Sequence, residues 1–211
     1  SILLSAADGG FSSVSSFKTG SSTASLTDLA LGDFDHDGLL DVAASNANET
    51  RLIFNQGAGT FVLPDAGTDF RVLPYPRARL EATDWNGDGI DDLVLFASSS
   101  WALAPGTPSR QPTAAPLTLP FASSPHAIGL ADLNGDSRRD VMTVDSSTGV
   151  LQLQWSLAGT SGPLRLATGT VARTGVGRLR TADFGRNLKP DVIAITTASS
   201  LPPQVCLWSG Q

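Results

Sequence analysis

The chain has few of the residues that form disulfides or carry out catalysis. Cys206 is the only cysteine, which makes an internal disulfide impossible and excludes a disulfide-stapled secreted scaffold. His36 and His126 are the only histidines, and Cys206 has no sequence-evident histidine partner. The sequence also lacks a Gly-x-Ser-x-Gly elbow, a His-Glu-x-x-His motif and a phosphate-binding glycine-rich loop. We therefore expect that the protein is not an enzyme.

Charge is sparse as well. Charged residues make up 16% of the chain, and no run of lysine or arginine is present. Such a run would mark a nucleic-acid or anionic-membrane surface, so neither partner is expected. The segment 1–7 is too short and too weakly apolar for a signal peptide or a membrane span, and no membrane insertion is expected. Because the chain starts at Ser1 without Met, we interpret it as a processed or excised segment of a longer chain.

Turn-forming residues are abundant by contrast. The chain contains 21 glycines and 13 prolines, and 41% of its residues are hydrophobic, which is enough for a core. Short runs of Val, Ile, Leu and Phe are bounded by Gly, Asn, Asp and Pro, a pattern typical of strands and hairpins rather than helices. The sequence therefore predicts an all-β fold.

A nine-residue acidic pattern recurs four times along the chain. Its copies start at Asp33, Asp84, Asp132 and Asp183, at intervals of 51, 48 and 51 residues. A period near fifty residues is long enough for one four-stranded blade of a β-propeller. We predict a β-propeller of four-stranded antiparallel blades, about four of them visible, that is either a minimal ring or a piece of a larger one.

The repeat predicts one continuous domain over residues 1–211. We expect part of a blade at 1–25 and repeats at about 26–75, 76–124, 125–175 and 176–211, with seventeen strands in total. The proline-rich segment 105–120 has the phase of a blade loop and an outer strand rather than of an interdomain linker. Proline is tolerated there because one side of an outermost strand has no partner.

The first copy, residues 33–41, has carboxylates at its first, third, fifth and ninth positions, namely Asp33, Asp35, Asp37 and Asp41. Alternate side chains of a tight loop converge on one point, and Gly38 permits the positive φ of the turn. A cage of carboxylates and carbonyls without Cys or His suits Ca²⁺ better than Zn²⁺ or copper. We therefore predict Ca²⁺ as the bound ion.

The acidity of the chain is local to these loops. Twelve of the 20 acidic residues lie at repeat ligand positions, and three Ca²⁺ ions would balance the net charge of −6. A general acidic field that steers cationic partners is therefore not indicated. Loops of this kind often bind Ca²⁺ at ~10⁻⁴ to 10⁻³ M, a concentration met outside cells, so we expect an extracellular, cell-surface or periplasmic location.

The run from Leu31 to Val42, followed by Asn55 to Phe61, resembles the FG-GAP/VCBS repeat. That family includes the seven-bladed head of integrin alpha chains and many bacterial secreted proteins. The resemblance implies a propeller with Ca²⁺ between the first and second strands of a blade, and it allows a seven-bladed ring with further blades or domains in a longer chain. It implies side-chain ligands in three loops and carbonyl ligands at position seven: Asp33, Asp35, Asp37, Asp41 and Leu39; Asp84, Asn86, Asp88, Asp92 and Ile90; Asp132, Asn134, Asp136, Asp140 and Arg138.

Two other interpretations of the acidic loops stay open. An EF-hand or dockerin loop needs flanking helices and a Glu at loop position twelve, where this chain has Ala44, Leu95 and Thr143 in strand-like runs. Asp and Asn also favour tight turns without metal, although carboxylates packed so closely would repel one another strongly. Ca²⁺ binding is therefore favoured over both alternatives.

The fourth copy, residues 183–191, is less complete. Gly185 has no side chain at position three, and Leu188 replaces the turn glycine. Arg186 and Lys189 add positive charge, which reduces the Coulomb attraction for a cation. We therefore predict three Ca²⁺ sites and a fourth loop that is empty or weak.

Position two of each loop is apolar, and its residues Phe34, Trp85, Leu133 and Phe184 are predicted to be core. His36, at a position that supplies no ligand, is predicted to be solvated surface. The remaining tryptophans occupy third strands at a similar phase, which favours blade packing over a sugar-stacking platform; they are Trp101, Trp155 and Trp208.

The sequence favours a calcium-stabilised extracellular β-propeller that acts as a binding, scaffold or cell-adhesion module. Loops on one propeller face are expected to recognise a protein or glycan ligand. A lectin, or the propeller domain of a polysaccharide-degrading enzyme with lyase activity, is the alternative. Carboxylates that hold Ca²⁺ stay ionised and make poor general acids at neutral pH, which disfavours the enzyme.

Overall fold

The computed structural model describes residues 2–5, 10–15, 25–58, 60–61, 70–97, 100–112, 115–117, 125–133, 135–136, 139–145, 151–155, 165–169, 176–184, 186, 190–196 and 204–208. These residues form seventeen strands and no helix, so the all-β class is confirmed. In this described part, no helix is long and apolar enough to span a membrane. The chain forms two compact units, Ser1–Leu117 and Thr118–Gln211. That the two units form one continuous domain stays a prediction.

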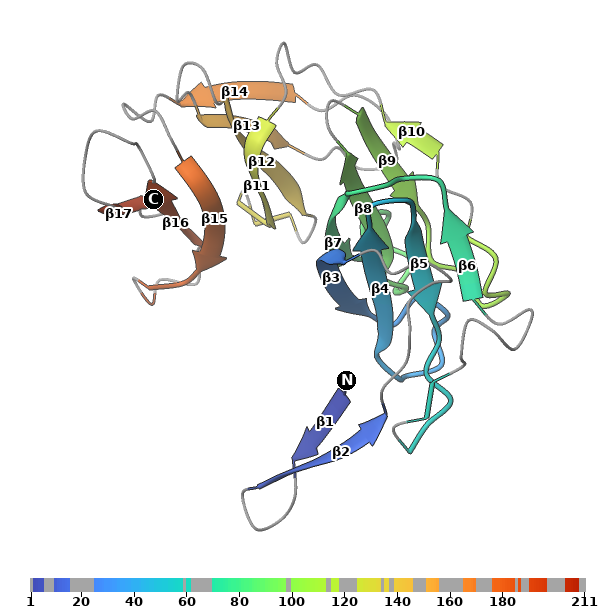
Figure 1. Cartoon of the computed structure of the whole chain (residues 1–211). Coiled ribbons are helices and arrows are strands. Elements are labelled where there is room, and N and C mark those ends of the chain that lie inside the picture. Colours follow the sequence, from blue (N-terminus) through green and yellow to red (C-terminus); the bar gives the residue numbers. More distant parts are fainter. Residues whose placement is uncertain are drawn as a thin grey trace. The chain divides into compact units, whose positions relative to one another are not determined.

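The first unit contains a hairpin and two four-stranded antiparallel blades (Figure 1). The hairpin pairs β1 (Ile2–Ser5) with β2 (Phe11–Ser15). The strands of the first blade, in order of pairing, are β3 (Leu26–Gly32), β4 (Asp41–Asn46), β5 (Thr50–Ile53) and β6 (Phe70–Leu73). Those of the second blade are β7 (Arg79–Thr83), β8 (Asp92–Ala97), β9 (Ser100–Ala104) and β10 (Ala115–Leu117).

The second unit contains one four-stranded and one three-stranded antiparallel sheet. The strands of the third blade, in order of pairing, are β11 (Pro125–Ala131), β12 (Asp140–Asp145), β13 (Leu151–Trp155) and β14 (Arg165–Gly169). The fourth sheet pairs β15 (Val176–Ala182), β16 (Asp191–Thr196) and β17 (Gln204–Trp208). Each strand pairs with its sequence neighbour, as expected of propeller blades.

The proline-rich segment behaves as the sequence predicts where the structure describes it. Pro116 lies in β10, which is at the outer edge of the second blade. One side of this strand has no hydrogen-bonding neighbour in the sheet, so the missing N–H of proline costs little there. The prediction of an edge strand is confirmed for residues 115–117.

The first two blades share a hydrophobic core, with β3 beside β7 (Figure 1). Ala30, Leu52 and Phe54 of the first blade pack in one cluster with Leu80 and Leu93 of the second. Burial of each Leu or Phe side chain contributes roughly 1.5–3 kcal/mol to folding. This packing fixes how the acidic loops of the two blades, residues 33–41 and 84–92, meet.

The second unit repeats this arrangement on a smaller scale. Met142 and Val144 of β12 pack with Leu179 of β15 and Val192 of β16. All four side chains are nearly inaccessible to solvent. The third and fourth blades therefore also join through the faces of their sheets.

Position two of the loops is buried in the first two blades, packs partly buried against the core of the second unit in the third, and is exposed in the fourth. Phe34 and Trp85 are 1% and 7% exposed, and Leu133 is half-buried, whereas Phe184 is 52% exposed. Phe34 lies under the segment 105–112 of the second blade, and its carbonyl accepts a hydrogen bond from the Thr107 N–H. In the described part of the chain Phe184 has no equivalent cover, so the prediction that it is core is wrong.

Two of the tryptophans are confirmed as packing residues. Trp85 and Trp101 are 7% and 5% exposed, and the Trp101 ring lies edge-on to Phe96 with 3.9 Å between centroids. Neither offers a flat exposed face for a sugar. Trp155 and Trp208 lie in β13 and β17, but their side chains fall outside the described residues.

Candidate metal centres

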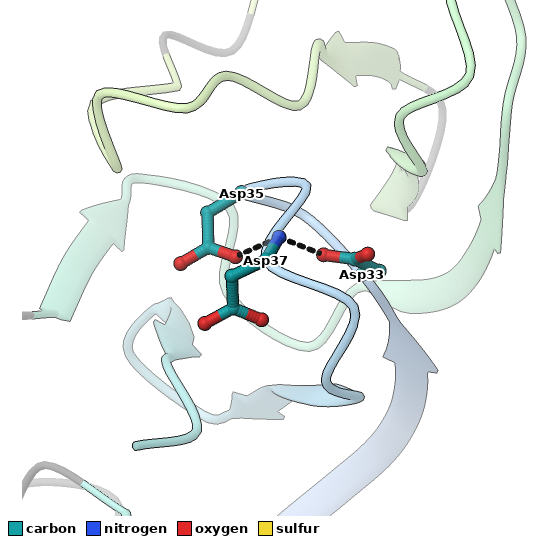
Figure 2. A group of neighbouring side chains, drawn as sticks. All are labelled: Asp33, Asp35 and Asp37. Atoms are coloured by element: carbon teal, nitrogen blue, oxygen red, sulfur yellow. Dashed lines mark hydrogen bonds between the residues drawn. The ribbon is translucent and has the colours of Figure 1, made fainter. Parts of the chain in front are cut away.

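The first acidic loop connects β3 to β4 and brings three carboxylates together. Figure 2 shows the side chains of Asp33, Asp35 and Asp37 gathered around the backbone nitrogen of Asp37. One oxygen of each lies within 4.8 Å of the others. The Asp37 N–H donates to Asp33 Oδ1 at 3.1 Å and to Asp35 Oδ1 at 3.2 Å. The convergence expected from alternate positions is therefore confirmed for these three residues.

The turn that closes this loop needs residues with positive φ. Gly38 has a φ of 83°, as predicted, and its N–H donates to Asp33 Oδ2 at 2.9 Å. His36, also in the left-handed region at 63°, is exposed as predicted. Leu39 follows, and its N–H donates to Asp37 Oδ1 at 2.9 Å. These bonds orient the carboxylates before any ion is present.

The second loop, between β7 and β8, has the same internal hydrogen bonds. Asp84 Oδ1 accepts from the N–H of Asp88 at 3.1 Å, and Asp84 Oδ2 accepts from that of Gly89 at 2.9 Å. Asn86 accepts from the Asp88 N–H and donates through Nδ2 to Asp88 Oδ2 at 3.0 Å. Ile90 donates its N–H to Asp88 Oδ1 at 2.9 Å, as Leu39 does in the first loop. The two loops are therefore copies of one scaffold.

The ninth residue of each loop is buried at its base. Asp41 accepts from the N–H groups of Phe34 at 3.0 Å and Asn55 at 2.8 Å, and Asp92 accepts from those of Trp85 at 2.9 Å and Gly106 at 2.8 Å. Burial raises the pKa of Asp41 to about 7 and that of Asp92 to about 6, against the opposing effect of these hydrogen bonds. These carboxylates therefore tie each loop to the chain around it, whether or not they also touch an ion.

The same bond from position two to position nine occurs in the second unit. Asp140 Oδ2 accepts from the Leu133 N–H at 2.9 Å, and Asp191 Oδ2 accepts from the Phe184 N–H at 2.7 Å. Arg186 has a φ of 53° at the position of His36. The fourth loop thus keeps the described framework of the others, although its sequence is less complete.

The third loop is only partly described. Asp132 Oδ1 accepts from the N–H groups of Gly135 at 2.7 Å and Asp136 at 3.1 Å, as in the second loop. Asn134 and Arg138, two of its predicted ligands, lie outside the described residues. In the fourth loop Gly185, Asn187, Leu188 and Lys189 also lie outside them, so its predicted lack of metal stays a prediction.

The donor atoms of the first two loops fit a hard cation. They are carboxylate and amide oxygens, and each residue keeps at least one oxygen lone pair, even Asp84, whose Oδ1 accepts from the N–H groups of both Gly87 and Asp88. Asp33, Asp35 and Asp37 would hold Ca²⁺ in the first loop, and Asp84, Asn86 and Asp88 would hold it in the second. Asp41 and Asp92, with the carbonyls of Leu39 and Ile90, stay predicted ligands, as do those of the third loop.

Comparison with known families agrees with this repeated scaffold. The model of the FG-GAP-like repeat matches residues 33–95 and 84–143, which together cover more than half of the chain. The chain belongs to the FG-GAP-like repeat family. No curated protein sequence matches it. Each FG-GAP match starts at the first Asp of an acidic loop and ends in the second strand of the next blade.

Sequence reasoning missed the residues that link neighbouring FG-GAP repeats. Asp91 Oδ2 accepts from the Asp33 N–H at 2.9 Å, and the Asp91 N–H donates to the Asp33 carbonyl at 3.1 Å. Asp28 Oδ2 likewise accepts from the Leu80 N–H at 3.0 Å. Position eight holds Leu40 in the first loop, so no recurring pattern marks Asp91.

Arg110 is the other residue that the repeat pattern gave no reason to select. It lies between β9 and β10, in the proline-rich segment, and its guanidinium forms ion pairs with Asp35 and Asp37 of the first FG-GAP loop. The contact joins residues 75 and 73 positions apart. No other repeat has an arginine at the corresponding position, so the repeat pattern does not indicate a role for Arg110.

Proposed function

We propose that this FG-GAP array is a calcium-stabilised β-propeller module of an extracellular, cell-surface or periplasmic protein. It binds a protein or glycan partner through loops on one propeller face. The observation that supports the metal most strongly is the approach of the Asp33, Asp35 and Asp37 oxygens to within 4.8 Å of one another. Carboxylates at that distance repel, and a divalent cation turns the repulsion into attraction.

A bound ion would stabilise more than its own loop. Asp33 is a predicted ligand through its side chain, and its backbone N–H and carbonyl are bonded to Asp91 of the next blade. Fixing Asp33 therefore also fixes the junction between the first two blades. The role assigned to Ca²⁺ is structural, in the same way that disulfides stabilise other small extracellular domains.

The environment of the carboxylates supports binding rather than catalysis. Asp41 and Asp92 have pKa values raised to about 7 and 6 by burial, which would suit a general acid. Both are 0% exposed and accept two backbone hydrogen bonds, so neither reaches a substrate. Of the other acids in these loops, Asp91 is hydrogen-bonded to the backbone of Asp33, and the rest are predicted ligands of the proposed metal sites.

Thermal unfolding in Ca²⁺ and in excess chelator tests the structural metal. At a free Ca²⁺ concentration tenfold above Kd, each occupied site adds ~1.4 kcal/mol to the free energy of unfolding, so the melting temperature should rise by several degrees. Mg²⁺ at the same concentration serves as a control for ionic strength. Identical melting curves in Ca²⁺ and chelator would refute the proposal.

The partner class needs a separate experiment with the Ca²⁺-loaded chain. Binding to a glycan array would favour a lectin, and capture of a defined extracellular protein would favour a protein-binding scaffold. Turnover of acidic polysaccharides by the chain would contradict the proposal that it is a binding module and support the lyase alternative.

A further inference from the structure

The first FG-GAP loop differs from the second in having an arginine from the neighbouring blade on its carboxylates. We propose that Arg110 competes with the cation for Asp35 and Asp37, and that it makes the first loop the weaker of the two Ca²⁺ sites in this unit. By the charge at the predicted ligand positions alone the order should be the reverse, because the first loop has four carboxylates there and the second has three and an Asn. This inference rests on the proposed Ca²⁺ binding.

The guanidinium takes the carboxylate oxygens that the loop itself leaves unused. Arg110 Nε donates to Asp35 Oδ2 at 2.5 Å, and Arg110 Nη2 donates to Asp37 Oδ2 at 3.2 Å. The backbone N–H bonds within the loop go to the other oxygen of each residue, Asp35 Oδ1 and Asp37 Oδ1. A forked donor with full positive charge therefore binds the two oxygens, Asp35 Oδ2 and Asp37 Oδ2, that accept no backbone hydrogen bond within the loop.

Burial strengthens this contact. The Asp35 side chain is 2% exposed and that of Arg110 is 27% exposed, so water screens the pair less than it would at the surface. The Asp37 pair is more open, with 30% of that side chain exposed. The contact with Asp35 is therefore the stronger of the two.

The segment that carries Arg110, residues 105–112, is fixed on both blades. The Gly106 N–H donates to Asp92 Oδ1 of the second blade at 2.8 Å, and the Thr107 N–H donates to the Phe34 carbonyl of the first at 2.9 Å. The guanidinium lies over the Phe54 ring, 5.3 Å from its centroid. Arg110 is thus held in place before an ion arrives, and little entropy is lost when it pairs.

The second loop has no such competitor among the described residues. Asp88 Oδ2 accepts from the Asn86 amide, which is neutral and belongs to the loop itself. The ion pairs in the described part of the chain include none to Asp84 or Asp88. As far as the described residues show, Ca²⁺ at this loop displaces no cation, whereas Ca²⁺ at the first loop must displace Arg110 or share oxygens with it.

The test is a Ca²⁺ titration of the full ¹⁵N-labelled chain by NMR, which reads each site separately. The Gly38 and Gly89 amides each donate to the first Asp of their own loop, so each reports its own site. In the wild-type chain the midpoint of the change in the Gly38 amide signal should lie at about tenfold higher free Ca²⁺ than that of Gly89. An effect of this size is expected when charge-assisted hydrogen bonds must be lost before the ion binds. The Arg110 Nε–H signal should move with the Gly38 midpoint.

Substitutions of Arg110 distinguish its competition with Ca²⁺ from other effects on the first loop. Arg110→Gln should lower the Gly38 midpoint by about tenfold and leave that of Gly89 unchanged, because hydrogen-bonding capacity remains while the charge is lost. Arg110→Lys keeps the charge but loses the forked geometry of the guanidinium. Its Gly38 midpoint should lie between those of the wild-type chain and Arg110→Gln. Arg77→Gln is the control, since Arg77 also has a positive φ, 53° against 59° for Arg110, but forms no ion pair in the described part of the chain, and it should move neither midpoint.

The outcomes distinguish this inference from the proposed function. A Gly38 midpoint that is unchanged or raised in Arg110→Gln, while Gly89 still titrates, overturns the role of Arg110 alone. If Arg110→Gln does not fold, a wild-type midpoint in Arg110→Lys has the same meaning. If neither glycine responds to Ca²⁺ in any chain, the proposed metal sites fail and this inference fails with them.

Discussion

Asp91 shows how a residue outside the predicted ligand set can join two repeats. The repeat pattern assigns it no ligand position, and its equivalents are Leu40, Arg139 and Pro190. The structure places its side-chain oxygen on the Asp33 N–H, so it closes a reciprocal pair of bonds with the neighbouring loop. An acid at this position therefore stabilises the junction of two blades through its hydrogen bonds to Asp33.

Replacing Asp91 separates this role from metal binding. Asp91→Ala leaves the partly buried Asp33 N–H without its acceptor, so it should lower the free energy of unfolding by ~1–3 kcal/mol in both Ca²⁺ and chelator. Asp88→Ala, in the same loop, should cost more in Ca²⁺ than in chelator, since Asp88 is a predicted ligand. Urea unfolding of both variants under both conditions measures the difference. A loss in Asp91→Ala that vanishes in chelator would mean that Asp91 acts through the metal.

At the scale of single elements, the strands were the most predictable part of the molecule. Short apolar runs such as 93–97 and 192–196 are bounded by turn residues, and β8 and β16 coincide with these two runs to within one residue. The glycine turn of the metal loop was predictable for the same local reason, because Gly38 supplies a conformation that other residues rarely adopt. Local chemistry alone determines these features.

The contacts between elements were not predictable from one sequence. Arg110 reaches Asp35 only because the segment 105–112 crosses from the second blade to the first, and the exposure of Phe184 depends on the absence of an equivalent cover in the described fourth blade. Neither the contact of Arg110 with Asp35 nor the exposure of Phe184 follows the period of the repeat in the sequence. Both are set by tertiary packing, which a repeat pattern does not encode.

The segment 105–112 depends on close backbone approach at Gly106. A Cβ atom at this position would overlap the Asp91 carbonyl and the Ile90 side chain and crowd the Phe34 carbonyl. Gly106→Ala should therefore lower the free energy of unfolding by ~1–3 kcal/mol and weaken the contact of Arg110 with the first loop. Ser109→Ala, at an exposed position of the same segment, is the control and should cost less than ~0.5 kcal/mol. Equal stability of the two variants in chemical unfolding would show that the segment is not packed as described.

At the scale of the whole molecule, four copies of one loop scaffold are built into an all-β chain of the FG-GAP-like repeat family. The bond from position two to the buried ninth Asp is present in every copy, including the fourth. The fold of the loop is therefore common to all repeats, while the ligands at positions three and five differ. We therefore expect the number of bound Ca²⁺ ions per chain to depend on the side chains at these positions and not on the fold of the loop.

Counting the bound ions by native mass spectrometry at ~1 mM free Ca²⁺ tests this account most directly. The wild-type chain should carry three Ca²⁺ ions, Asp88→Asn should carry two, and Glu49→Gln, an acid outside the loops, should still carry three. Three ions that fall to two only when a loop ligand is replaced would support calcium-stabilised repeats. A chain that retains no Ca²⁺, or one whose count does not change in Asp88→Asn, would contradict them.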